Sequence, residues 1–235
     1  MTQRAGRSVA AVLVVCLAAT GCSRTVAGTP LAAGDRDADG SARSLTPSEL
    51  DRLLLSDGQI STIMGVDKMK TYRAYTGVPV QPDEVYRDPQ CAGMLFNTTV
   101  PGYDGVDYVT SRGRKIDVSG RGSSDQTDEV DEAVVAFETA SEATKFVQAS
   151  EVQWHSCSGK KTVYTGTDRE VHPWRLGMPR KVGEIIAVNN QTPDGWQCGH
   201  AMAARANVVA DVDACGYDIK DQAVTIVKAI ITVAQ

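Results

Sequence analysis

The first 22 residues constrain the rest of the chain most, because they determine the compartment in which it folds. Arg4 and Arg7 precede an apolar run over residues 9–19, and no acidic residue occurs before Cys22. This order of basic, apolar and small residues is typical of a secretory signal that is removed after export. The apolar run has about eleven residues, whereas a helix that crosses a bilayer needs about twenty. The remaining chain is therefore expected to fold outside the cytoplasm.

Residues 17–22 read LAATGC and resemble a lipobox, in which a signal peptidase cleaves before an acylated cysteine. Ala19 stands where Leu is usual, three residues before this cysteine, so ordinary cleavage and release is the alternative. Two acyl chains give stable membrane attachment, whereas one gives only marginal binding. We expect residues 1–21 to be a lipoprotein signal peptide. We expect Cys22 to anchor the mature chain to the extracytoplasmic face of the cell membrane.

Four cysteines remain once Cys16 leaves with the signal and Cys22 is acylated: Cys91, Cys157, Cys198 and Cys215. In an oxidising compartment an even set of cysteines indicates disulfides, and four cysteines allow three pairings. Their order favours pairing the first with the second and the third with the fourth. A zinc site is the alternative, but no C-x-x-C pair occurs, and His155 and His200 merely lie two residues from a cysteine. We expect structural disulfides, no metal and no cofactor.

Charge and composition limit which partners the chain can bind and indicate where its folded domain begins. Removal of the signal takes two of the 24 basic residues and none of the 29 acidic ones, which leaves a net charge of −7. Nucleic acid is therefore not an expected partner, since phosphate contact needs a positive surface. Residues 22–44 lack apolar periodicity and predict a flexible tether. Residues 35–40 copy half of an EF-hand loop, but Thr46 stands where a closing Glu is needed, so calcium is not expected.

The pattern from residue 45 onward predicts an α+β domain. Capping boxes, which begin helices, occur at residues 46–49, 56–59 and 139–142. The third predicts a helix that ends near Cys157, a short helix is expected over residues 89–96, and residues 220–233 predict a closing helix with Val233 facing inward. Strands are predicted at residues 69–76, 106–112, 132–138, 161–165, 184–190, 197–204 and 207–212. We expect a mainly antiparallel sheet packed with helices.

Sequence motifs give little support for catalysis. The chain has no G-x-S-x-G elbow, no S-x-x-K with its partner motifs and no H-E-x-x-H. His155 and His172 are interpreted as surface or capping residues. The acidic residues at positions 128, 129, 131 and 132 are interpreted as a solvated loop before a strand. We predict that the chain is not an enzyme.

Three segments resemble the extracellular sensor domain of mycobacterial PknH-type serine/threonine kinases. They are residues 133–159, which end in WHSCSG, residues 195–202, which read GWQCGHAM, and residues 207–215, which read NVVADVDAC. The resemblance extends over residues 45–235. It implies an α+β domain with a central cleft for an unidentified extracellular ligand, and disulfides that join Cys91 to Cys157 and Cys198 to Cys215. It implies no catalytic residues.

Relatives of that sensor domain occur as stand-alone mycobacterial lipoproteins, which this chain also resembles. We expect a membrane-tethered domain that binds a small molecule, glycan or lipid of the envelope and passes a signal to a membrane protein. Trp196 and His200 are the predicted ligand contacts, and His200 stands where relatives are expected to have Arg. The alternative for Trp196, as for Trp154 and Trp174, is core packing. The alternative functions are a lipid carrier, a cell-wall or lipid hydrolase, and a protein that acts through its surface.

Overall fold

The computed structural model describes residues 45–81, 83–120, 122 and 127–234, all within one compact unit. The predictions for the signal, Cys22 and the tether lie outside these residues. In the part of the chain that is described, no helix is both long and apolar enough to cross a membrane.

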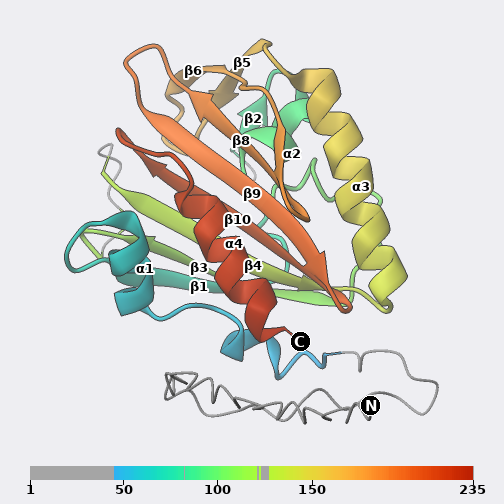
Figure 1. Cartoon of the computed structure of the whole chain (residues 1–235). Helices are drawn as coiled ribbons and strands as arrows, with labels where there is room; N and C mark the ends of the chain where they lie inside the picture. The colour runs from blue at the N-terminus through green and yellow to red at the C-terminus, as the bar shows by residue number, and fades with distance from the viewer. Residues whose placement is uncertain (1–44, 82, 121, 123–126, 235) are drawn as a thin grey trace, which may run out of the picture. The chain divides into compact units, whose positions relative to one another are not determined.

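Ten strands of the described residues form one antiparallel sheet (Figure 1). Their order is β1-β3-β4-β10-β9-β8-β6-β5-β2, and β7 pairs with β8. The strands are β1 Lys70–Thr76, β2 Val85–Tyr86, β3 Thr110–Asp117, β4 Glu129–Ala136, β5 Lys161–Thr165, β6 Val171–Arg175, β7 Arg180–Val182, β8 Ile185–Gln191, β9 Gln197–Arg205 and β10 Val208–Gly216. The predicted α+β class with a mainly antiparallel sheet is confirmed.

The described residues form six helices. They are η1 Leu50–Arg52, α1 Asp57–Met64, η2 Pro89–Cys91, α2 Ala92–Leu95, α3 Ala140–Cys157 and α4 Gln222–Val233, with η marking short 3₁₀ helices. Helices α1 and α3 begin where their capping boxes predict, whereas the box at residues 46–49 precedes only a short 3₁₀ helix. Ser56 and Thr139 each close a capping box with the residue three positions later. Helix α1 ends at Gly65, whose φ of +73° lies in the left-handed region that favours glycine.

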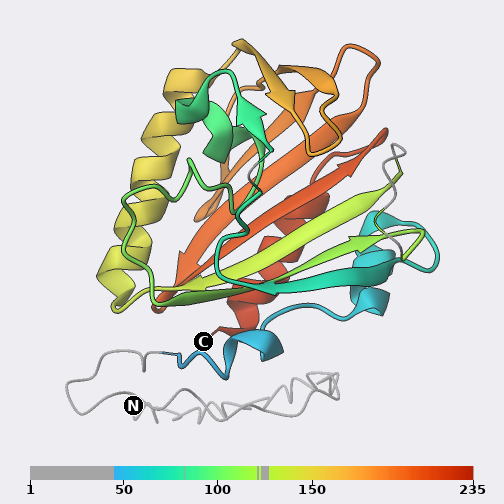
Figure 2. The same ribbon diagram turned by 180° about the vertical axis from the view of Figure 1, so that it is seen from behind.

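Each face of the sheet packs against different helices (Figures 1 and 2). Strand β10 is buried along its whole length, so its alternating residues belong to two cores. Val212 and its alternate neighbours pack in the cluster that contains residues of α4, η1 and α1. Val209 packs in the cluster with residues of α3 and α2. Asp211 and Asp213 lie on this second face, which places charged groups inside the protein.

Both disulfides form with the pairing that the resemblance implied. Cys91 bonds to Cys157 and ties η2 to the end of α3. Cys198 bonds to Cys215, which lies directly opposite it in the β9–β10 ladder. In the chain-entropy model the longer loop contributes about 4 kcal/mol and the shorter one about 3 kcal/mol. The longer bridge also fixes the segment that follows Cys91 over the second face of the sheet.

Four local predictions need correction. The strand expected at residues 106–112 lies at Thr110–Asp117, and β2, β6 and β7 were not expected. Strand β6 contains Pro173, a residue that argues against a strand because it lacks a backbone donor. The acidic run was wrongly interpreted as a solvated loop, since three of its residues lie in β4 and Glu132 is fully buried against Arg114. Val233 is 43% exposed and does not face inward as predicted, although Ile230 in the same turn is buried.

Candidate functional site

A row of charged side chains crosses four neighbouring strands. Lys115 of β3 lies opposite Asp131 of β4, and Asp131 lies opposite Asp213 of β10. Asp213 in turn lies opposite His200 of β9. Directly opposed residues of adjacent strands point to the same face of a sheet, so these four side chains share the face covered by α3 and α2.

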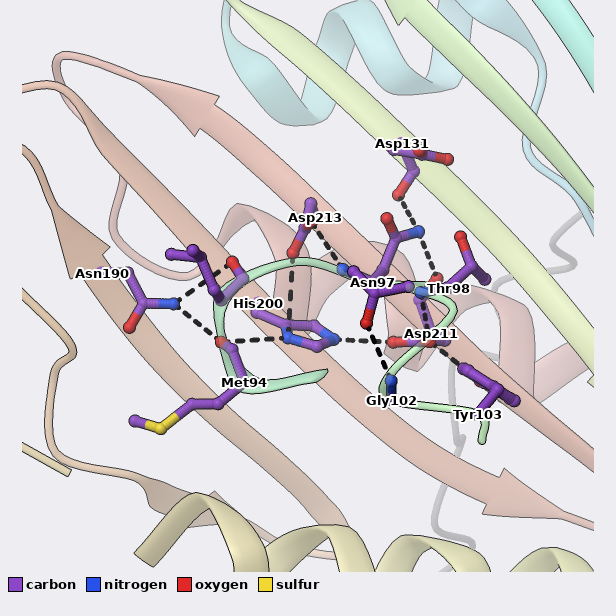
Figure 3. A network of polar contacts seen from close by, with 12 residues as sticks. Met94, Asn97, Thr98, Gly102, Tyr103, Asp131, Asn190, His200, Asp211 and Asp213 are labelled. Carbon is purple, nitrogen blue, oxygen red and sulfur yellow. Dashed lines mark hydrogen bonds and ion pairs between the residues drawn. The ribbon is translucent and has the colours of Figure 1, made fainter. Parts of the chain in front are cut away.

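His200 is the most enclosed member of this row. It is 1% exposed, and its Nε2 lies 2.6 Å from Oδ1 of Asp211, which is 0% exposed. Its Nδ1 lies 3.4 Å from the carbonyl oxygen of Met94 and 3.9 Å from Oδ1 of Asp213 (Figure 3). Both ring nitrogens therefore face acceptors, which favours the imidazolium. Burial lowers the pKa of His200, but Asp213 and Asp211 outweigh it, and the pKa lies above its ordinary value.

The two aspartates of β10 hold the segment between α2 and β3 against the sheet. Oδ2 of Asp211 accepts hydrogen bonds from the Thr98 amide at 3.0 Å and the Tyr103 hydroxyl at 2.9 Å. Oδ2 of Asp213 accepts from the Asn97 amide at 2.8 Å. The Asn97 side chain donates to the carbonyls of Asp131 and Asp211 (Figure 3). Hydrogen bonds to buried charges are among the strong ones, so this segment is firmly placed.

Asp131 is held by two side chains that reach it from β3 and, across β3, from β1. Lys115 Nζ lies 2.7 Å from its Oδ2, and the Tyr75 hydroxyl donates to its Oδ1 at 2.6 Å. Tyr75 reaches it across Gly113, where an added Cβ would overlap the tyrosine ring. Burial lowers the pKa of Lys115, but Asp131 outweighs burial and raises it.

Beside this row lies a pocket of about 190 Å³ with tyrosine walls. Tyr86 and Tyr164 pack with ring centroids 5.2 Å apart, and Phe96 meets Tyr164 edge-on at 5.0 Å. Glu84 accepts hydrogen bonds from the hydroxyls of Tyr164 at 2.5 Å and of Tyr86 at 3.3 Å. The charged residues of the lining are Glu84, Lys115, Glu129, Asp131 and Asp213. One lysine therefore faces four carboxyl groups.

Two carboxyl groups of this lining lack full compensation. Glu129 is half-buried and makes no hydrogen bond or ion pair with a described residue, whereas Lys115 is already bound by Asp131. Asp213 is 4% exposed, and its Oδ1 accepts no hydrogen bond from the described chain. Burial raises the pKa of Glu129, with Lys115 opposing it. Burial also raises the pKa of Asp213 to about 7, although His200 opposes the shift. The arrangement suits a ligand that supplies positive charge.

Trp196 and His200, the two residues predicted to contact a ligand, lie outside the lining of the tyrosine-walled pocket. His200 is part of the charged row but is enclosed, with the Trp154 ring at 4.5 Å between centroids. Trp196 is buried and meets Tyr217 edge-on at 5.3 Å. Neither lines the tyrosine-walled pocket, so their contact with a ligand stays a prediction. Sequence reasoning missed Lys115, Glu129 and Asp213, for which the signal was a pair of aspartates inside the apolar run of β10.

The site offers binding groups more clearly than reactive ones. His200 and Asp211 have the spacing of a base and its orienting carboxylate, but the ring is too enclosed to meet a substrate. Within the described ranges, no group of three or more His, Cys, Asp or Glu residues is arranged to hold a metal ion. The groups of the pocket can pair with charge, donate and accept hydrogen bonds, and stack on a ligand.

Comparison with known proteins places this geometry in a family. The family model for the PknH-like extracellular domain matches residues 45–232. Serine/threonine-protein kinase PknH from Mycobacterium bovis is 33% identical over 184 residues, covering 77% of this chain and 30% of that protein. PknH from Mycobacterium tuberculosis has the same identity over 184 residues, covering 77% of this chain and 29% of that protein. The chain thus matches less than a third of the length of these relatives.

A solved structure matches as well. The crystal structure of the extracellular domain of PknH from Mycobacterium tuberculosis superposes with a TM-score of 0.76 at 30% sequence identity. The match covers 82% of this chain and 97% of that one.

Proposed function

This chain belongs to the family of PknH-like extracellular domains, and we propose that it is a membrane-tethered extracytoplasmic binding domain for a small, positively charged ligand. The ligand enters the tyrosine-walled pocket beside β3, β4 and β10. The observation that carries this proposal is the excess of carboxyl groups there: among the described residues Glu129 has no partner, and Oδ1 of Asp213 accepts no hydrogen bond and has only His200 at 3.9 Å.

Electrostatics supports a cation rather than an anion or a neutral molecule. A buried carboxylate without compensation is costly, and a cation in the pocket removes that cost. The faces of Tyr86 and Tyr164 carry the negative potential that attracts ammonium groups. Because the pKa of Asp213 is about 7, ionisation strengthens cation binding as pH rises through neutrality.

The size of the pocket supports a ligand of few atoms. Sites for drug-sized molecules occupy about 300–1,000 Å³, and this pocket has about 190 Å³. Its lining mixes charged and aromatic groups, whereas an acyl chain needs a long apolar cavity. A small polar ligand is therefore better supported at this pocket than lipid carriage or lipid hydrolysis.

Titration calorimetry with matched probes tests this proposal. Choline and ethanolamine are the cationic probes, and the neutral carbon isostere of choline is the control ligand. We expect both cations to bind the wild-type chain and the isostere to bind much more weakly. Asp213→Asn and Glu129→Gln should each reduce cation binding, whereas Glu184→Gln, which changes an exposed carboxylate outside the pocket, should not. Equal binding of the isostere, or a tightly held lipid after purification, would contradict the proposal.

The location is proposed on separate grounds. The relatives are membrane kinases whose matching region is extracellular, and the lipobox of this chain supplies a different attachment through Cys22. A signal from the bound ligand then passes to a membrane protein partner. Cys22→Ala should move the protein from the membrane to the soluble fraction in cell fractionation. Continued membrane association of this variant would contradict lipid anchoring.

A further inference from the structure

A second pocket lies beside β5 and β6, and its lining includes Arg87, Lys161 and Arg175 together with Thr162 and Trp174. The Arg87 amide donates to the carbonyl of Val163 at 3.0 Å, which continues the pairing of β2 with β5. Lys161 lies directly opposite Arg175 in the β5–β6 ladder. Because side chains alternate along strands, Arg87, Lys161 and Arg175 point to one face, and their neighbours Tyr86, Thr162 and Trp174 point to the other.

The three cations have no negative partner in the part of the chain that the structure describes. Among the described residues, none of their side chains makes an ion pair or a hydrogen bond, and all three residues are exposed. They line a pocket of about 560 Å³ whose described lining contains no Asp or Glu. This is unusual in a chain with 29 acidic and 24 basic residues. Like charges placed directly opposite each other destabilise a strand pair, so Lys161 and Arg175 carry a cost that the fold does not explain.

The pocket lies far from the point where the chain enters the domain. Leu45 bonds to Asn207, beside the turn between β9 and β10. Gln191, which lines the pocket, pairs with Gln197 at the other end of β9. The nine residues of β9 span about 26 Å at about 3.3 Å per residue. The cationic pocket therefore lies at the end of the domain that is remote from residue 45.

We propose that this cationic pocket binds a phosphate group. A phosphate monoester carries about −1.5 to −2 charges at neutral pH and three acceptor oxygens, so it matches three converging cations better than a carboxylate does. The planar guanidinium groups of Arg87 and Arg175 can each donate two parallel hydrogen bonds to phosphate oxygens, and Lys161 adds a compact charge. Gln191, opposite Arg175, adds a neutral amide donor. This site is separate from the tyrosine-walled pocket and does not depend on the function proposed for it.

Calorimetric titration tests the proposal. The protein is expressed as the full chain in a mycobacterial host, which processes it, and is then purified. The probes are inorganic phosphate, glycerol phosphate as the headgroup of a phospholipid, and a hexose phosphate as a wall sugar. We expect at least one of them to bind at low ionic strength and to weaken as salt is added. Tighter binding of glycerol phosphate would assign the site to lipid headgroups. Tighter binding of hexose phosphate would assign it to glycans, and equal binding would show that phosphate alone is recognised.

A matched pair of double variants separates the pocket from general charge. Lys161→Gln with Arg175→Gln should weaken phosphate binding on the order of tenfold or more. Lys145→Gln with Lys228→Gln removes the same charge from exposed positions of α3 and α4 and should leave binding unchanged. Circular dichroism confirms that each variant is folded. Failure of all three probes to bind the wild-type chain, or equal weakening by both double variants, would overturn the proposal.

Discussion

The two faces of β2, β5 and β6 differ in how their side chains are held. On the inner face, Tyr86 and Tyr164 pack with tilted rings and both donate to Glu84, and Trp174 meets Phe96 edge-on at 5.5 Å. On the outer face, the cations have no partner among the described residues. Strand alternation separates the tyrosines of the inner face from the cations of the outer face. The same short strands can therefore serve two ligands of opposite charge.

The comparison predicts different responses to solution conditions. The inner carboxyl groups are enclosed, so salt screens them weakly and pH controls them through shifted pKa values. The outer cations are exposed, so salt screens them strongly. Binding at the inner pocket should depend mainly on pH, and binding at the outer pocket mainly on ionic strength.

Substitution of two adjacent residues of β6 tests most directly whether their side chains lie on opposite faces. Trp174→Ala removes a ring that is 6% exposed and should cost about 3–5 kcal/mol in the free energy of unfolding. Arg175→Ala removes an exposed side chain on the other face and should change it by about 0.5 kcal/mol or less. Both Trp174→Ala and Trp174→Phe remove a buried Nε1 that lacks an acceptor in the described chain, but Trp174→Phe should cost less because it keeps an aromatic ring against Phe96. Urea denaturation measures all three, and similar costs at 174 and 175 would contradict the assignment of faces.

Gly113→Ala tests how firmly the acidic row beside the inner pocket is held. An added Cβ would overlap the Tyr75 ring, so the tyrosine must leave Asp131, at a cost of about 1–3 kcal/mol. Denaturation of the single variants and of Gly113→Ala with Tyr75→Ala gives the coupling between the two positions. The double variant should cost less than the sum of the single costs. Additive costs would show that Tyr75 does not need the space above Gly113.

Stability should fall as pH rises through neutrality. Asp213 and Glu132 have folded-state pKa values of about 7, raised by burial above the ordinary values of about 3.9 and 4.3. The raised pKa of His200 acts in the same direction. A raised pKa means that the folded state holds its proton longer, so this stability is complete below about pH 4 and is lost as pH passes about 7.

Thermal denaturation at about pH 5 and about pH 8 measures this loss, which we expect to be on the order of 1–2 kcal/mol. Asp213→Asn should reduce the difference, whereas Asp67→Asn, at an exposed position, should leave it unchanged. Greater stability at the higher pH would show that Asp213 is ionised in the fold.

Local signals in the sequence were sufficient for much of the fold. The boxes at Ser56 and Thr139 place helix starts because the capping groups lie within four residues of each other. Strand β6 was missed because Pro173 argues against a strand, yet Trp174 on the same strand is buried. Local propensity could not predict that Trp174 is buried, because the burial depends on packing against Phe96, which is distant in sequence.

The site was harder to predict because its residues meet only through strand register. Asp131 and Asp213 are far apart in sequence and directly opposed in the sheet. The acidic run at residues 128–132 was assigned to solvent because clustered carboxylates are usually solvated. Three of its residues lie in β4, where Asp131 pairs with Lys115 and Glu132 pairs with Arg114. His200 was predicted to contact a ligand, which stays a prediction, and it lies buried in β9. Its enclosure by Met94 and Trp154 depends on elements distant in sequence.

Removal of one outer cation should produce the smallest effect and a gain in stability. Lys161→Gln relieves the repulsion from Arg175, so we expect up to about 1 kcal/mol of added stability at low ionic strength. The gain should disappear at high salt, and added phosphate should stabilise the wild-type chain but not the variant. Thermal denaturation measures each case, with Lys228→Gln as the control. If Lys161→Gln is neutral at low salt, the opposed cations carry no cost, and the outer face is an ordinary solvated surface rather than one kept basic for a ligand.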